Sequence, residues 1–310
     1  MVNWVQVLRK NLVARLAKNA GLRQHAVTLD DAATVINFWL PNQNKEPCRK
    51  DRQRKKNLHP VVLVHGFAGD GIMTWGLQVG ALAKAGHDVY VPDLLHFGGS
   101  TSPSHDRSVG FQARCLVAAL RKLGVGVADV VGFSYGGFVA FEMAAANPSL
   151  VHSVVVSGGT VKYTGAMKDA LLERIGGARL FTELMLPESA DRLRVLFLAA
   201  MHMKLWFPCR LLQDFLEVMY KNRMERAGML EDLVVGDKGS STPVFQQNIL
   251  LLWGENDNFF PIEVGESLKQ ELGEKATLQR VSKAGHLVQL ERPCVYNRNL
   301  IEFLAHGNMV

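Results

Sequence analysis

A G-x-S-x-G pentapeptide spans Gly132-Phe133-Ser134-Tyr135-Gly136. This spacing is typical of a nucleophilic serine at the apex of a sharp strand-to-helix turn. A Cβ atom at Gly132 or Gly136 would obstruct the close approach of the strand and the helix. The turn also directs helix N-terminal amides toward a developing oxyanion. Ser134 is therefore the candidate nucleophile.

A serine hydroxyl is a weak nucleophile near neutral pH, so it needs a base and a carboxylate that orients the base. Asp257 follows the expected strand 249–253, and His286 follows the apolar run 276–281. The chain order Ser134, Asp257, His286 is the order that this type of sheet requires. Glu255 is the rival acid. We prefer Asp257 because Glu255 lies nearer the strand end, where we expect it to face solvent.

A second backbone donor for the oxyanion is expected from the segment after the apolar run 61–64. This run leads into His65, Gly66 and Phe67, followed by a Gly-containing loop. The N–H groups of Phe67 and Tyr135 are the predicted oxyanion hole. His65 is interpreted as a structural hydrogen-bonding residue and not as a base.

These residues need a scaffold, and an alternation of strands and helices predicts one. Because parallel strands joined by helices form a doubly wound sheet, we expect an α/β fold with active groups at the carboxyl ends of its strands. An antiparallel pair is expected at residues 25–29 and 34–40. The other expected strands are 61–64, 89–91, 130–132, 154–157 and 249–253, and the helices between them are 75–85, 110–123 and 137–147.

The alternation stops between residues 160 and 243, where several helical segments follow one another. We interpret 160–243 as a helical cap inserted into a core made of residues 23–159 and 244–310. Its methionine-rich sequence predicts core filling, an adaptable apolar pocket, or both. The expected cap helices are 166–175, 179–186, 190–203 and 209–229.

Residues 1–22 are predicted to form a separate amphipathic helix, since Trp4, Leu8, Leu12 and Leu16 recur at helical spacing. The helix is interpreted as packed on the body with a solvated cationic face. A weak membrane-surface contact or an organelle-targeting role is the alternative. The basic segment 45–56 is interpreted as an exposed, solvated loop, with a docking patch as the alternative.

The net charge of +6 is concentrated in two short segments of the 310 residues. Residues 1–29 hold five cations and no acid, and residues 45–56 hold seven cations against two acids. The rest of the chain is mildly acidic, so we expect no nucleic-acid partner. Four scattered cysteines without a C-x-x-C pair predict a reduced, cytoplasmic protein without structural zinc. The sequence has no cluster of metal-ligating residues, and Gly124 and Gly126 lack the third glycine of a dinucleotide fingerprint, so neither a metal nor a cofactor is expected.

Together these motifs resemble the α/β-hydrolase superfamily over residues 25 to 305. The segment 92–100 and the G-H-x-x-x-x-E-x-P tail at 285–293 belong to the likeness. The tail and the cap resemble the branch that holds meta-cleavage-product C–C hydrolases, monoacylglycerol lipases, epoxide hydrolases and dehalogenases. The N-terminal helix is similar to that of uncharacterised plant members.

The resemblance implies a nucleophilic Ser134, a general base His286, an orienting acid Asp257, and oxyanion amides at Phe67 and Tyr135. Epoxide hydrolases and dehalogenases of the branch carry Asp at the elbow, so Ser134 argues against both. C–C hydrolases usually have a small polar residue where this chain has Phe67. Asp93 belongs to a loop that is structural in the superfamily, so it is not assigned a catalytic role.

The leading hypothesis is a cofactor-free serine hydrolase that cleaves a small ester with an apolar acyl group through an acyl-enzyme. One alternative is a C–C hydrolase of vinylogous diketones, which would need a polar pocket for the dienol acid. The other is a small-molecule receptor with little turnover, because strigolactone and karrikin receptors share this fold, triad and lid.

Overall fold

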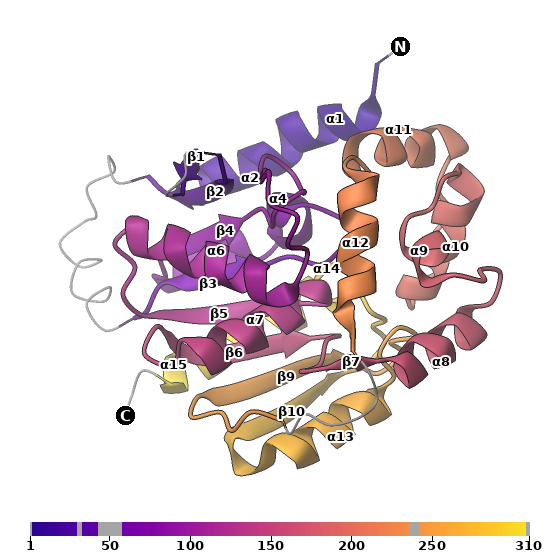
Figure 1. Ribbon diagram of the computed structural model, residues 1–310. Helices are drawn as coiled ribbons and strands as arrows, with labels where there is room; N and C mark the ends of the chain where they lie inside the picture. Colours follow the sequence, from indigo (N-terminus) through magenta and orange to yellow (C-terminus); the bar gives the residue numbers. More distant parts are fainter. Residues whose placement is uncertain (1, 30–32, 43–57, 236–241, 308–310) are drawn as a thin grey trace.

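The computed structural model describes residues 2–29, 33–42, 58–235 and 242–307, and it centres on one eight-stranded sheet (Figure 1). The strand order is β1-β2-β4-β3-β5-β6-β9-β10. β1 and β2 form the predicted antiparallel pair, β2 also pairs antiparallel with β4, and the remaining neighbours are parallel. The strands are β1 (Leu22–Thr28), β2 (Val35–Pro41), β3 (Val61–Val64), β4 (Val89–Pro92), β5 (Ala128–Phe133), β6 (Val151–Ser157), β9 (Asn248–Gly254) and β10 (Ala276–Val281).

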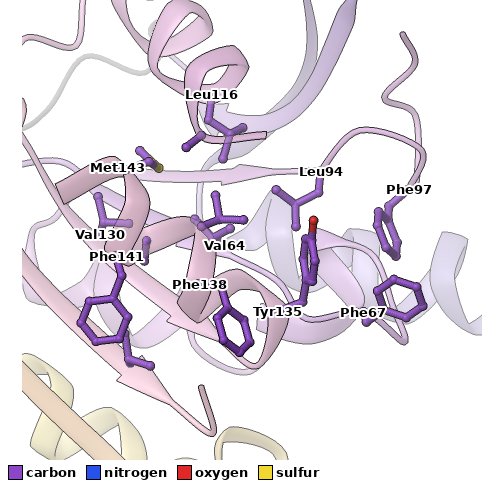
Figure 2. Packing of buried hydrophobic residues seen from close by; sticks show 14 of the residues in the cluster. Val64, Phe67, Leu94, Phe97, Leu116, Val130, Tyr135, Phe138, Phe141 and Met143 are labelled. Carbon is purple, nitrogen blue, oxygen red and sulfur yellow. The ribbon is translucent and has the colours of Figure 1, made fainter. Parts of the chain in front are cut away.

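Helices cover both faces of the sheet, so the α/β expectation is confirmed. Successive residues of a strand point to opposite faces, and the apolar strands therefore feed two cores. Val62 and Val64 pack with residues of α6 and α7, whereas Val61 and Leu63 pack with residues of α5 and α15. Figure 2 shows the first of these cores around Val64, Leu116 and Val130. The bounds are α4 (Gly71–Trp75), α5 (Val79–Ala85), α6 (Val109–Lys122), α7 (Tyr135–Ala146), α13 (Ile262–Leu272), α14 (Val288–Glu291) and α15 (Pro293–Gly307), with the 3₁₀ turn η2 (Gly273–Lys275) after α13.

Between β6 and β9 the chain forms a largely helical insertion. Its helices are α8 (Gly165–Ile175), α9 (Phe181–Met185), α10 (Ala190–Ala200), α11 (Cys209–Met219) and α12 (Arg223–Leu233). Two short strands, β7 (Tyr163–Thr164) and β8 (Val234–Val235), pair in parallel at its base and were not expected from the sequence. The division of the chain into a core, a cap and an N-terminal unit stays a prediction.

Three of the predicted helices have other bounds in the structure, and one of them is broken in two. The expected helix 75–85 starts only at Val79, as α5, because Trp75 is the last residue of α4 and residues 76–78 lie between the two helices. The expected helix 209–229 stops at Met219, and α12 starts after Asn222, whose φ of 53° lies in the left-handed region. A single left-handed residue reverses the local backbone direction and cannot continue a helix. The helix expected at 190–203 also ends earlier, at Ala200.

The N-terminal helix is present, but its apolar stripe does not face the body. It consists of α1 (Trp4–Leu8), a π-helical turn η1 (Arg9–Val13) and α2 (Ala14–Asn19). The buried side chains are Val5, Val13 and Ala17, while Trp4, Leu8 and Leu12 are exposed. Arg9 points toward the body and forms a 2.7 Å ion pair with Asp70. The buried positions therefore lie one residue after the predicted ones, at Val5 instead of Trp4 and at Val13 instead of Leu12. The basic segment 45–56, interpreted from the sequence as an exposed loop, lies entirely outside the described residues.

Candidate active site

Ser134 stands at the end of β5, where the chain turns directly into α7. Its φ of 53° and ψ of −120° are unusual for a residue with a side chain, so the turn is strained. The backbone holds this strain with two hydrogen bonds: the N–H of Ser134 donates to the carbonyl of Ser157, and its carbonyl accepts from the N–H of Gly137, both at 2.8 Å. The turn therefore presents the hydroxyl of Ser134 at the carboxyl end of the parallel strands.

The glycines on both sides of Ser134 are required by backbone contacts. A Cβ atom at Gly132 would lie 2.3 Å from the carbonyl oxygen of Gly136. One at Gly136 would lie 2.4 Å from the carbonyl oxygen of Val64. Backbone atoms of packed elements cannot give way as a flexible side chain can. Any larger residue at either position would move the turn that carries Ser134.

The structure brings Ser134, His286 and Asp257 together, although they are far apart in the sequence. The Oγ atom of Ser134 lies 3.0 Å from Nε2 of His286, and Nδ1 of His286 lies 2.9 Å from Oδ2 of Asp257. Because a carboxylate only accepts, Nδ1 carries the proton and Nε2 is free to accept the serine proton. This is the arrangement of a nucleophile, a base and an orienting acid.

Asp257 is held rigidly by the loop after β9. Its second oxygen, Oδ1, accepts hydrogen bonds from the N–H groups of Phe259 at 2.7 Å and Phe260 at 2.9 Å. Both oxygens of the buried carboxylate are thus satisfied. Glu255, the rival acid, is exposed, and its backbone N–H donates to the carbonyl of Val281.

Aromatic rings enclose His286. The ring of Phe259 stacks on it with a centroid distance of 4.7 Å, and the rings of Phe133 and Phe260 lie at 4.9 Å and 5.8 Å. Gly158 packs directly against the imidazole, because a Cβ atom at this position would lie 2.6 Å from Nδ1 of His286. Sequence reasoning did not identify Phe259, Phe260 or Gly158. The Gly-Gly pair after an apolar strand was the only available signal for Gly158.

The predicted oxyanion amides flank Ser134. Phe67 and Tyr135 line the same small pocket as Ser134, and their rings meet edge to face at 5.9 Å (Figure 2). Within the described part of the chain, neither of their N–H groups donates to a protein acceptor. The loop of Phe67 lies against the elbow, since a Cβ atom at Gly66 would meet Cβ of Ser134 at 3.1 Å. Two free N–H groups beside a nucleophile can stabilise a developing negative charge.

His65 fixes the oxyanion loop. Its Nε2 accepts from the N–H of Leu94 at 2.9 Å, and its Nδ1 lies 2.7 Å from the carbonyl oxygen of Gly66. Only the neutral ring with the proton on Nδ1 satisfies both partners. Burial lowers the pKa of His65 to about 4, which agrees with a neutral structural ring. The carbonyl of Gly66 belongs to the same peptide group as the N–H of Phe67, so His65 orients that donor.

Asp93 also has a structural position. Its carboxylate accepts from the N–H groups of Gly71 and Gly99 and from Nδ2 of Asn37, at 2.8–3.0 Å. Burial raises the pKa of Asp93, as it does that of the neighbouring Asp70. Asp93 therefore ties the loop after β4 to β2 and α4, and it does not reach Ser134.

The helical insertion contacts the loop after β4 through Arg226 of α12. Its Nε donates to the carbonyl of His96 at 3.2 Å, and its guanidinium lies over the ring of Phe97 at 3.9 Å. Phe97 in turn packs edge to face on Phe67 at 5.5 Å (Figure 2). Burial lowers the pKa of Arg226 to about 10, so the side chain remains charged near neutral pH. The insertion is thus joined to the oxyanion loop through packed rings.

Two apolar spaces lie at or near the site, and Ser134 lines only the smaller one. Ser134 itself lines a narrow pocket of about 20 Å³ with aromatic and aliphatic walls. A larger chamber of about 420 Å³ begins beside Gly66, Phe133 and Leu287, which are neighbours of the site residues. The insertion supplies much of its outer wall: Phe197, Met201, Met203, Leu205, Phe207 and Phe215.

Glu291 is the charged side chain of the large chamber, and its oxygens are engaged. Oε1 accepts from the N–H of Gly285 at 2.8 Å, and Oε2 accepts from the N–H of Met203 at 2.9 Å. Glu291 thereby joins the loop of His286 to the insertion. Among the described residues, no group of three or more His, Cys, Asp or Glu side chains is placed to hold a metal ion. No helix of the described segments is both long and apolar enough to cross a membrane.

Comparison with known proteins agrees with this geometry. Residues 59–293 match the family model described as alpha/beta hydrolase fold. The 2-hydroxy-6-oxononadienedioate/2-hydroxy-6-oxononatrienedioate hydrolase of Paraburkholderia xenovorans (strain LB400) is 28% identical over 259 residues, which are 79% of this chain and 86% of that protein. The resemblance to the meta-cleavage-product branch is thus confirmed at the level of sequence.

Solved structures give the same fold. A putative lipase from Acinetobacter baumannii AYE superposes with a TM-score of 0.77 at 19% identity and covers 96% of each chain. The 2-hydroxy-6-oxo-6-phenylhexa-2,4-dienoate hydrolase from Rhodococcus sp. strain RHA1 superposes with a TM-score of 0.71 at 19% identity, covering 91% of this chain and 98% of that one. Because the family model matches most of the sequence and the sheet has the matching topology, this chain belongs to the alpha/beta hydrolase fold family.

Proposed function

We propose that this α/β hydrolase is a serine esterase that cleaves carboxylic esters with an apolar acyl group. The observation that carries the proposal is the hydrogen-bonded series Ser134–His286–Asp257, together with an apolar chamber of about 420 Å³ whose wall includes Phe133 and Leu287, the chain neighbours of Ser134 and His286. Apolar walls stabilise a hydrocarbon chain and give no compensation for a buried charge.

The chemistry follows the positions of the groups. Ser134 Oγ attacks the ester carbonyl while His286 Nε2 accepts its proton, and Asp257 stabilises the imidazolium. The N–H groups of Phe67 and Tyr135 hold the oxyanion. His286 then protonates the leaving alcohol, which leaves an acyl-enzyme on Ser134. A water molecule, deprotonated by His286, releases the acid in the second half of the reaction.

C–C bond hydrolysis is the second candidate, because the relatives identified by sequence are named hydrolases of 2-hydroxy-6-oxononadienedioate and 2-hydroxy-6-oxononatrienedioate. The substrate named there is a dioate, which has two carboxylates. A buried carboxylate needs a cation or several hydrogen-bond donors. Among the described residues that line the narrow pocket and the large chamber, none is Lys or Arg, and Glu291 of the chamber would repel an anion. The lining therefore favours the ester over the dioate.

A direct comparison of substrates tests the proposal. We would assay p-nitrophenyl esters of increasing chain length beside a 2-hydroxy-6-oxo-dienedioate, using the wild type and Ser134→Ala. We expect kcat/KM to rise from the acetate toward medium-chain esters and to be at least about a hundredfold lower for the dioate, as a charged group costs several kcal/mol in an apolar site. Preferred cleavage of the dioate would reject the ester assignment. A single burst without steady turnover would instead indicate the receptor.

A further inference from the structure

The N-terminal helix exposes an apolar stripe that no described part of the chain covers. Trp4, Leu8 and Leu12 are 59%, 42% and 54% exposed. They follow one another at a spacing of four residues, so they lie on one side of the helix. The opposite side, which carries Val5 and Val13, already provides the contact with the body. Packing among the described residues therefore does not explain the exposed stripe.

A second exposed apolar segment lies at the same end of the molecule. Trp206 is 80% exposed, and its neighbour Leu205 is 40% exposed. Four residues further on, Arg210 donates from Nη2 to the carbonyl of Val2. Four residues span at most about 14 Å, so Trp206 lies near the start of α1. Figure 1 shows α1 and α11 meeting along one edge of the molecule. We define the apolar patch as Val2, Trp4, Leu8, Leu12, Leu205 and Trp206.

The charges beside the apolar patch are mostly positive. Lys10, Arg15 and Lys18 of the N-terminal helix are exposed, and residues 1–29 contain no acid. The neighbouring acids of α11 are engaged: Asp214 pairs with Arg210, and Glu217 accepts from Nδ2 of Asn3. A surface with exposed tryptophans, aliphatic side chains and exposed cations complements an anionic lipid headgroup layer.

We propose that the apolar patch docks this protein on the surface of an anionic phospholipid bilayer. The N-terminal helix then lies in the plane of the interface, with Trp4, Leu8 and Leu12 among the upper acyl chains and Arg15 and Lys18 at the phosphates. Trp206 enters the same layer from the insertion.

This orientation has a consequence for substrate entry, which rests on the proposed function. Met203 and Leu205, on either side of Lys204, line the large chamber and are themselves 50% and 40% exposed. The rim of the chamber therefore belongs to the docked surface. An apolar ester dissolved in the bilayer would pass from the lipid to the chamber without crossing water.

The tryptophans provide a direct test of binding that needs no substrate. Of the five tryptophans, Trp39, Trp75 and Trp253 are buried, whereas Trp4 and Trp206 belong to the apolar patch. We would titrate the full chain with vesicles of phosphatidylcholine containing about 30 mol% phosphatidylglycerol, and with phosphatidylcholine alone. We expect a blue shift and quenching by brominated acyl chains with the anionic vesicles. Trp4→Leu and Trp206→Leu should each remove part of the quenching.

Matched variants separate this interface from general adhesion. Trp4→Ser/Trp206→Ser should lower the vesicle partition coefficient at least about tenfold, and Arg15→Gln/Lys18→Gln should lower it about tenfold on anionic vesicles only. Val244→Ser changes an exposed apolar residue outside the patch, and Lys269→Gln/Lys275→Gln removes two exposed cations of α13 and η2; both should leave binding unchanged.

Two outcomes would overturn the proposal. One is the absence of quenching and of flotation with anionic vesicles. The other is a concentration-dependent dimer in sedimentation that Trp206→Ser dissolves, which would assign the patch to a second copy of the chain. A wild-type protein that binds anionic vesicles but hydrolyses no ester would reject the proposed function and leave the docking proposal standing.

Discussion

The carboxyl ends of the central strands and the helical insertion meet at Ser134, but they are built differently. The strand ends position the reacting groups mainly through backbone contacts: Gly136 lies under the carbonyl of Val64, and Gly158 lies under His286. The insertion contributes long, adaptable side chains such as Met203, Leu205 and Phe215 to the chamber wall. A substitution at the strand ends should therefore change the rate of reaction, whereas one in the insertion should change which substrate reacts.

The largest effect is expected from the two acids at the end of β9. Asp257→Asn should lower kcat about 10⁴-fold, because the amide would hold His286 in the wrong tautomer. Glu255→Gln is the matched control and should change kcat less than about twofold, since Glu255 is exposed and does not reach the imidazole. Steady-state ester hydrolysis measures both. Equal losses in the two variants would contradict the assignment of the orienting acid.

The next effect concerns the support of the imidazole. Gly158→Ala places a methyl group 2.6 Å from Nδ1 of His286, and the φ of +56° disfavours any side chain. We expect kcat to fall about 10²–10³-fold, because a displacement of about 1 Å is sufficient for such a loss. Gly126→Ala is the control, since nothing lies within 4 Å of its added Cβ. Circular dichroism verifies that both variants fold, and full activity in folded Gly158→Ala would refute the contact.

His65 should make the stability of the fold depend on pH. Its pKa is about 4 in the folded chain and 6.5 in the unfolded chain, so the unfolded state binds the proton first as the pH falls. The stabilisation is present above pH 6.5 and is lost as the pH falls toward 4. We expect the wild type to lose about 2 kcal/mol more unfolding free energy than His65→Gln between pH 7 and 5. Urea titrations of both proteins at the two pH values measure the unfolding free energies. An equal loss of unfolding free energy in the wild type and in His65→Gln would contradict the prediction.

The smallest effect should come from the insertion. Leu205→Trp narrows the chamber from its outer wall, so kcat/KM for long-chain esters should fall about tenfold, while that for p-nitrophenyl acetate should change less than about twofold. Chain-length profiles of the variant and the wild type provide the comparison. An equal loss of kcat/KM for esters of all chain lengths would mean that the insertion affects the reaction at Ser134 and not the choice of substrate.

The same division explains which features could be predicted from the sequence. The strands and the elbow were predicted because β-branched runs and the glycines at 132 and 136 report local backbone requirements. The proximity of Ser134, Asp257 and His286 was predicted because the ends of parallel strands share one edge of a sheet. The aromatic enclosure by Phe259 and Phe260 was missed because it depends on how one loop folds over His286.

The ends of helices, and the faces that they bury, were less predictable where tertiary contacts determine them. Apolar spacing suggested that Trp4, Leu8 and Leu12 face the body, but the Arg9–Asp70 ion pair and the π-helical turn align Val5 and Val13 inward instead. Nothing in the local sequence signals a partner 61 residues away. The break between α11 and α12 depends on Asn222, a residue that occurs both inside helices and in left-handed turns.

The central claim is that Ser134 is an activated nucleophile. The most direct measurement is the intact mass of the protein after reaction with a fluorophosphonate, followed by peptide mapping, for the wild type and Ser134→Ala. The account predicts one adduct per chain, on Ser134, and none in the variant. An adduct at another serine, or a folded wild-type protein that remains unlabelled, would contradict it.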